Sequence, residues 1–387
     1  MQLRKLQKEE HGKTRALWEK VFTEDSKGFL DYYYFIKTQD NEIYALEEDG
    51  DIRSMVQLNP YTLQIEESQH LCHYVVGVST EESYRGRGYF REVFLKSLAD
   101  LYAAKEPFTF LMPAAKEIYL PYGFRFVYEQ VLAEITGKET EYEGNLRCRD
   151  ARLSDAAELA VFFEKWQQSQ LEDEKKQIYA LRDTKYWQTK FFELQSEDGG
   201  IHLVYLNKEL VGIFAYYDGE VLEILEPLFL PDYEDLFFRA VYELTGDEDV
   251  IAKCIAYPFA LDFPSVKSAE NKPIIMLRIL HLETLLKSLK VKEEEMIDCR
   301  FAVFDPLLIP NNKVWRLKSE KDSRELQVFE TEDSQGVIPV EALTDYLFGQ
   351  ITLDELEKEA FVILTEELKR ELDKIEPLER VFLNEIV

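Results

Sequence analysis

The sequence predicts an α+β fold divided into three domains, and three observations support this prediction. The chain has 387 residues, whereas an ordinary domain has roughly 100 to 200. Segments with helical periodicity alternate with strand-like segments in the first part of the chain. A stretch that begins near Leu146 repeats features of the N-terminal stretch. Because 46% of the residues are hydrophobic, the chain can form real cores, and we expect a globular protein.

The first domain is expected to combine helices with antiparallel strands. Leu17, Trp18, Val21 and Phe22 recur at helical spacing, and Asp49-Gly50 suits the tight turn of a β-hairpin. Such a layer has a ligand crevice where neighbouring strands separate. The expected elements are a helix over 8–22, a hairpin over 42–64, a buried strand over 73–80, a helix over 90–105, a short strand over 108–112, and a turn with a final strand pair over 117–135.

The second domain is expected to repeat the first. Residues 146–166 resemble residues 3–22, because both open with Leu-Arg and then place an aromatic-Glu-Lys triplet on a helix. Hairpins are expected at Asn207-Lys208 and at Asp218-Gly219. No second Arg-Gly-x-Gly sequence follows, so the pattern predicts a duplicated fold that lacks a cofactor-binding loop.

The last hundred residues have a different pattern and indicate a separate α+β domain. A strand and a helix are expected over 276–289, then strands over 299–331, a helix after Val337, and an extended segment at the chain end. We therefore divide the chain into residues 1–145, 146–284 and 285–387.

Composition excludes several classes of protein. The formal net charge of -29 disfavours nucleic-acid binding, which needs clustered Lys and Arg. The acidic balance is explained by solubility, or by attraction of a cationic amine. The four cysteines form no C-x-x-C pair, so we expect neither a metal site nor a disulfide framework. There is no long apolar run and no leader sequence, which predicts no membrane insertion and a cytoplasmic protein.

The segment from Val76 to Phe90 carries the main functional signal. A hydrophobic strand runs into Arg85-Gly86-Arg87-Gly88, and an amphipathic helix follows. Such a loop points backbone N–H groups and the positive end of a helix at a phosphate, while glycine allows close approach of the anion. An ordinary glycine turn is the alternative, and the strand and helix around the loop favour phosphate binding.

The same segment resembles the GNAT acetyltransferases, whose pyrophosphate loop reads Arg/Gln-x-x-Gly-x-Gly/Ala. Phe90 stands where that motif has Gly or Ala. This departure, the duplicated half and the C-terminal domain are similar to one subgroup, the Eis acetyltransferases. The resemblance covers essentially the whole chain. It implies tandem GNAT folds, the second one degenerate, followed by a sterol-carrier-protein-like domain.

The resemblance also implies a cofactor and catalytic groups. Acetyl-CoA is the expected donor, and its expected contacts are Val76, Val78, Arg85, Gly86, Arg87, Gly88, Tyr89 and Phe90. The family motif Ile-Tyr-x-x-Phe/Tyr-Gly-Phe/Tyr matches residues 118–124, which makes Tyr119 the expected general acid. The carboxylate of the last residue, Val387, is the expected base. Members of the family assemble as trimers or hexamers, so a homo-oligomer is expected.

The acceptor is less constrained by the sequence. Trp18, Phe22, Asp31 and Tyr34 offer aromatic faces and a carboxylate for a cation, although core packing explains the same residues. The predicted function is N-acetylation of a primary amine, on an aminoglycoside-like or polyamine-like molecule or an exposed lysine. Two alternatives remain: a non-catalytic acyl-CoA or lipid sensor, and a transferase for longer acyl chains.

Overall fold

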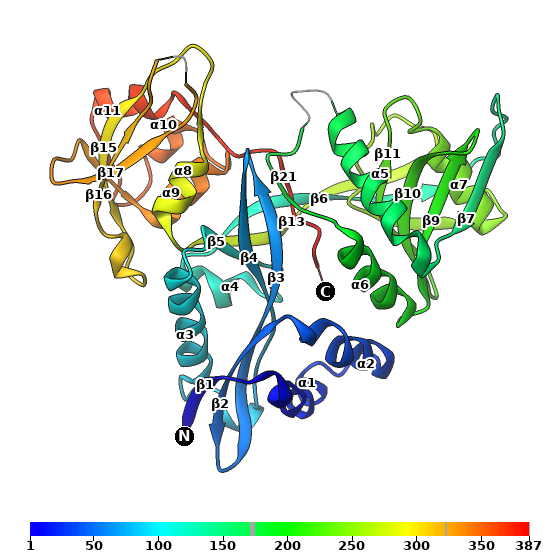
Figure 1. Cartoon of the computed structure of the whole chain (residues 1–387), viewed down its shortest axis with the longest axis horizontal. Helices are drawn as coiled ribbons and strands as arrows, with labels where there is room; N and C mark the ends of the chain where they lie inside the picture. Colours follow the sequence, from blue (N-terminus) through cyan, green and yellow to red (C-terminus); the bar gives the residue numbers. More distant parts are fainter. Residues whose placement is uncertain (171–174, 322, 387) are drawn as a thin grey trace.

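A computed structural model describes residues 1–170, 175–321 and 323–386 of the chain. The protein has three lobes, with the N-terminal part in the middle of the molecule and the other two parts on either side of it (Figure 1). The α+β architecture predicted from the sequence is confirmed, and most of the expected elements form close to their expected positions.

The first part of the chain contains the predicted helices, hairpin and strands. Asp49 and Gly50 both have positive φ, as the tight turn between the first two long strands requires. A second N-terminal helix, α2, was not expected. The elements are β1 (Gln2–Lys5), α1 (Arg15–Val21), α2 (Lys27–Phe35), β2 (Glu42–Glu48), β3 (Asp51–Ile65), β4 (Ser68–Thr80), α3 (Tyr89–Ala103), β5 (Phe108–Leu111), α4 (Lys116–Tyr119) and β6 (Arg125–Thr136).

The second part contains both predicted hairpins. Asn207 and Lys208 have φ values of 50° and 74°, the mirror-image turn that a two-residue hairpin favours. Helices α6 and α7 were not predicted. The elements are β7 (Leu146–Asp150), α5 (Ala156–Ser169), β8 (Ile178–Ala180), α6 (Thr184–Gln195), β9 (Gly199–Leu206), β10 (Glu209–Asp218), β11 (Leu222–Phe229), α7 (Leu236–Thr245), β12 (Ile251–Ile255) and β13 (Val266–Ile279).

The third part forms its own sheet in the order β17-β16-β15-β18-β19. Its elements are α8 (Leu282–Ser288), β14 (Lys290–Val291), β15 (Asp298–Phe304), β16 (Val314–Lys318), β17 (Gln327–Thr331), β18 (Gly336–Pro339), α9 (Val340–Leu347), α10 (Leu353–Leu356), β19 (Ile363–Leu364), α11 (Glu366–Leu372), β20 (Ile375–Glu376) and β21 (Val381–Phe382).

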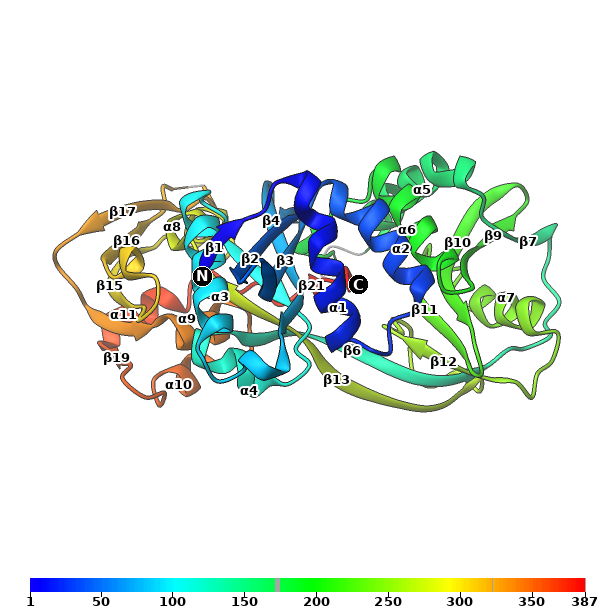
Figure 2. The same cartoon turned by 90° about the horizontal axis from the view of Figure 1, so that it is seen from below.

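One sheet joins the first two parts. Its order is β1-β2-β3-β4-β5-β13-β6-β12-β11-β10-β9-β7, so β13 lies between β5 and β6. The long strands β6 and β13 run side by side from one lobe to the other (Figure 2). The predicted boundary after residue 145 follows β6, and the one after residue 284 falls within α8. These boundaries remain predictions.

Neighbouring strands separate at one point of this sheet, as the sequence predicts for a ligand crevice. Strands β4 and β5 are parallel and share a single register pair, Tyr74 with Phe110. Beyond this pair, β4 continues to Thr80 without β5 beside it. The backbone groups of β4 on that side are therefore available to a ligand.

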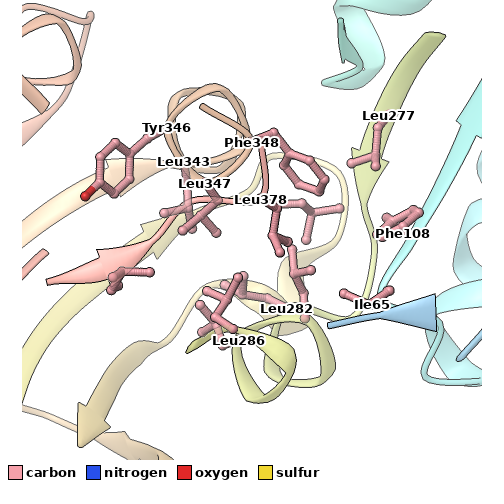
Figure 3. Close-up of a cluster of buried hydrophobic side chains, with 14 of the residues drawn as sticks. Ile65, Phe108, Leu277, Leu282, Leu286, Leu343, Tyr346, Leu347, Phe348 and Leu378 are labelled. Carbon is pink, nitrogen blue, oxygen red and sulfur yellow. The ribbon is translucent and has the colours of Figure 1, made fainter. Parts of the chain in front are cut away.

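The third part is fixed to the first by a shared hydrophobic core. Ile65 and Phe108 of the first part meet Leu282, Phe348 and Leu378 in one cluster (Figure 3). The chain then crosses back, and β21 pairs with β8, which in turn pairs with β3. The segment that follows β21, up to Ile386, consequently lies between the first two lobes (Figures 1 and 2).

Candidate active site

The Arg85–Gly88 segment forms an open turn at the start of α3. Gly86 and Gly88 have φ values of 78° and 85°, in the region that glycine adopts without strain. A Cβ atom at either position would meet no atom within 4 Å. The positive φ values explain both glycines, and the open space beside them is suited to a bulky anion.

The first turn of α3 presents free N–H groups beside this loop. Gly88 is its N-cap and has no side chain to cap the helix, so the N–H groups of the first turn and the positive end of the dipole can face an anion. Arg85 and Arg87 are both exposed, and Arg87 lies 4.5 Å from the centroid of the Tyr84 ring. Neither arginine has an ion-pair partner in the described part of the chain.

The strand that leads to this loop has an irregularity beside the crevice. The register of β3 and β4 shifts between Met55 and Gln57, opposite Gly77. Gly77 has φ of 58°, and a Cβ there would lie 2.5 Å from the Trp18 ring. Only glycine therefore fits. Val76 and Val78, on either side of Gly77, are partly buried on the strand that lines the crevice.

Tyr119 lies close to the start of α3, although about thirty residues separate them in the sequence. Its ring is edge-on to Phe90, Phe94 and Phe124, with centroid distances of 6.4, 5.9 and 5.8 Å. Phe90 directly follows the glycine loop, so the loop and the tyrosine share one aromatic cluster. Burial raises the pKa of Tyr119 to about 12, and the phenol keeps its proton at neutral pH.

A buried arginine supports the turn that follows Tyr119. Gly123 has φ of 78°, and a Cβ there would lie 2.9 Å from Nε of Arg278. Arg278 is fully buried on β13 and donates to Asp305 Oδ1 at 2.6 Å. Arg125, just after the turn, lies 3.3 Å from Asp345 on α9. The tyrosine turn is thus held by Arg278 of β13, which Asp305 of the third part fixes in place, and by Asp345 of the third part. No motif pointed to these residues in the sequence.

A cavity of about 380 Å³ lies where the first two lobes meet. We call it the acceptor cavity. Met112, at the end of β5, and Phe29, on α2, form part of its wall. Acidic groups predominate among its charged lining residues. These are the four acids Glu193, Glu197, Glu223 and Glu226 and the two lysines Lys190 and Lys272.

The C-terminal segment is fixed beside this cavity by buried polar contacts. Arg182 binds Glu226 through two hydrogen bonds of 2.6 and 2.7 Å and Glu385 at 3.1 Å. Asn384 donates to Glu226 and accepts from Gln130, at 2.7 and 2.8 Å. Ile386 lines the cavity. Val387 lies outside the described residues.

The four predicted acceptor residues lie on α1 and α2 or just after α1, and none lines the acceptor cavity. Trp18 packs in a buried aromatic cluster with Phe29 and Tyr33. Tyr34 shares a hydrogen bond of 2.9 Å with Thr14, and Asp31 is paired with Arg15 at 2.7 Å. Phe22 packs beside Trp18 at a centroid distance of 5.3 Å.

Two further residues, the predicted donor contact Tyr89 and the histidine His73, are held by contacts within the first lobe. Tyr89 is buried, and its hydroxyl donates to Glu48 at 2.8 Å. His73, on β4, is buried, and its Nδ1 lies 2.8 Å from Glu106 Oε1.

The open glycine loop at the N-terminus of α3 and the gap between the parallel strands β4 and β5 are features expected of an acyl-CoA-dependent acyltransferase. Residues 2–127 match the acetyltransferase (GNAT) domain family, and residues 282–385 match the sterol carrier protein domain family. The chain is therefore a GNAT-family N-acetyltransferase with a C-terminal sterol carrier protein domain. The GNAT domain implies an acyl-CoA donor and an amine acceptor.

Several solved structures share this fold over nearly the whole chain. A probable N-acyltransferase from Enterococcus faecalis has a TM-score of 0.82 at 16% identity, covering 98% of this chain and 97% of that one. A GCN5-related N-acetyltransferase from Anabaena variabilis has a TM-score of 0.77 at 16% identity, covering 98% of each chain. Eis1 from Mycobacterium abscessus has a TM-score of 0.70 at 15% identity, covering 100% of each chain. The chain thus has the Eis-like fold.

No curated protein matches the chain in sequence. None of the described helices combines the length and the apolar character that a membrane span requires. Within the same residues, no group of three or more His, Cys, Asp or Glu side chains is placed to hold a metal ion.

Proposed function

We propose that the protein transfers an acetyl group from acetyl-CoA to a primary amine of a cationic small molecule or an exposed lysine. One observation carries this proposal: Val78 on the unpaired end of β4, Phe90 after the glycine loop, and Tyr119 pack in one hydrophobic cluster. An acid-rich cavity adjoins the end of β5. Acetyl-CoA supplies an activated thioester. The protein supplies binding, orientation and proton transfer.

The donor is proposed to bind along β4 and the start of α3. The N–H groups of Gly86 and Gly88 and of the first turn of α3 bind the pyrophosphate, and Arg85 and Arg87 add positive charge. The backbone of Val76 and Val78 pairs with the pantetheine arm where β5 has left β4. Tyr89 supports the loop through Glu48, and Phe90 forms a wall between loop and tyrosine.

Tyr119 is proposed to donate a proton to the leaving thiolate. Burial raises the pKa of Tyr119 to about 12, which keeps it protonated but also weakens it as an acid. The same apolar surroundings disfavour a thiolate and raise the pKa of the thiol. The pKa values of the phenol and of the thiol are both raised, so proton transfer from Tyr119 to the thiolate stays feasible.

The Val387 carboxylate is proposed as the partner of the reacting amine. A carboxylate with a pKa of about 3.5 cannot deprotonate a free alkylammonium with a pKa of about 10.4. It holds the ammonium by charge and accepts the proton as the C–N bond forms and the nitrogen becomes acidic. The fixed positions of Asn384 and Glu385 support this role, because they leave only two residues of chain beyond them.

The acceptor is proposed to enter the acid-rich cavity, where Glu197 and Glu223 attract cations. In this proposal α2 contributes Phe29 to the cavity wall. The packing of α2 is stabilised by the four residues first expected to bind the acceptor, Trp18, Phe22, Asp31 and Tyr34. Assembly into a trimer or hexamer is part of the proposal, and sedimentation at several protein concentrations tests it.

The experiment measures release of the CoA thiol from acetyl-CoA with a panel of amines. We expect amine-dependent release from the wild type, and a strong loss of turnover after deletion of residues 386 and 387 while acetyl-CoA still binds. Unchanged turnover in the deletion variant would exclude the chain end as the base. Binding of acetyl-CoA without release for any amine would favour a sensor instead of an enzyme.

A further inference from the structure

A second cavity, of about 630 Å³, lies next to the acceptor cavity. We call it the side cavity. It is enclosed by the end of α2, by β3, by α6 and by the C-terminal segment. Tyr186, Lys190, Glu193 and Ile386 line both cavities. The two cavities therefore adjoin each other along these four residues.

Lys37 is an unusual residue in the side cavity. It is only 8% exposed, and its Nζ donates to the Tyr61 hydroxyl at 3.0 Å and lies 4.4 Å from the centroid of the same ring. In the described residues, no carboxylate lies within ion-pair distance of this nitrogen. Burial lowers the pKa of Lys37. Burial disfavours the charged ammonium, and the more distant carboxylates of Glu193, Asp40 and Glu385 offset only part of that effect.

Other charged side chains of the side cavity have partners. Lys185 is paired with Asp40 at 2.5 Å, and Lys190 is paired with Glu193. Glu385 is paired with Arg182. Lys37 differs from them, because its nearest polar partner is a neutral hydroxyl. An anionic group brought by a ligand would complete the site.

The charge of the cavity limits which anion it accepts. Asp40, Asp183, Glu193 and Glu385 line the same space, and a phosphate dianion would be repelled by them. A single carboxylate needs only one ammonium and one hydroxyl, which Lys37 and Tyr61 provide.

We propose that the side cavity binds a carboxylate of the acceptor through Lys37, while the reacting amine occupies the acceptor cavity. This inference rests on the proposed function and narrows its substrate class. The acceptor is an amine that also carries a carboxylate, such as a diamino acid or a peptide with a lysine near its carboxyl end.

The test compares lysine with 1,5-diaminopentane, which has the same chain without the carboxylate. Both are titrated calorimetrically into the wild-type protein and used as acceptors in the thiol-release assay. We expect lysine to bind at least tenfold more tightly. Lys37→Met should remove this preference and leave the diamine within twofold of its wild-type affinity, whereas Lys37→Arg should retain the preference.

Lys185→Met is the matched control, because Lys185 lines the same cavity but is paired with Asp40. It should leave the preference for lysine intact. Thermal unfolding checks that each variant folds. Equal affinity of the wild type for both amines, or a lysine preference that survives in Lys37→Met, would overturn the inference. Lys37-dependent lysine binding without thiol release for any amine would support the inference and refute the proposed acetyl transfer.

Discussion

Tyr119 illustrates how the surroundings of one residue define its chemistry. Its ring is enclosed by three phenylalanines, and burial alone raises its pKa. We expect Tyr119→Phe to lower kcat by about 100-fold, the usual contribution of a positioned acid, with acetyl-CoA affinity unchanged. The pH profile of the wild type should show no loss from this phenol below about pH 11. Steady-state kinetics and direct acetyl-CoA titration measure these effects.

Tyr122 provides the control for this substitution. It belongs to the same aromatic cluster, at 5.0 Å from Phe94, but it is less buried. Tyr122→Phe should retain kcat within a few-fold. A similar kcat for the wild type and Tyr119→Phe would show that the tyrosine only packs.

Gly123 allows the contact with Arg278 to be measured separately from backbone strain. Gly123→Ala places a methyl group 2.9 Å from the arginine at a positive φ, and we expect a loss of about 2 to 4 kcal/mol in unfolding free energy. Gly86→Ala has the same φ of 78° in open space, and should lose only about 1 kcal/mol. Denaturant unfolding without acetyl-CoA measures both, and equal losses would contradict a tight Arg278 contact.

At the scale of elements, the loop and α3 together form the proposed pyrophosphate site. We expect Arg85→Gln and Arg87→Gln each to raise the KM for acetyl-CoA several-fold with little change in kcat, because they act on binding and not on the reacting atoms. The effect should shrink at high salt. Lys96→Gln, on the same helix but paired with Asp100, is the control. A selective fall in kcat would argue against phosphate binding.

At the scale of the whole molecule, Asp345 links the third lobe to the tyrosine turn. Burial raises the pKa of Asp345 to about 6, above its ordinary value. The folded state therefore favours the protonated acid, and this contribution to stability is lost as pH rises from about 4 to 6. The unfolding free energy of the wild type should fall by up to about 3 kcal/mol over this pH range because of Asp345, and Asp345→Asn should remove this fall. Urea unfolding at pH 4, 5, 6 and 7 tests this, and an unchanged slope between pH 4 and 6 would contradict it.

The sequence predicted the elements with strong local signals. Alternation around Asp49-Gly50 and Asn207-Lys208 predicted the hairpins. The loop was predicted from Arg85-Gly86-Arg87-Gly88 together with the hydrophobic strand before it and the amphipathic helix after it. Helices α2, α6 and α7 were not predicted. The role of Arg278 was hidden because its partners, Gly123 and Asp305, are remote in sequence. The position of β13 between β5 and β6 depends on pairing between strands that are distant in the sequence, and no local sequence pattern predicts such pairing.

The position of β13 has a consequence for how the chain folds during synthesis. Strands β5 and β6 leave the ribosome well before β13, which begins only at Val266. Until then, both strands expose unpaired edges of the kind that promote aggregation. The catalytic lobe therefore belongs to the slow class of folds with many non-local contacts. A fragment that ends after β6 should aggregate, whereas one that extends through β13 gains the missing strand.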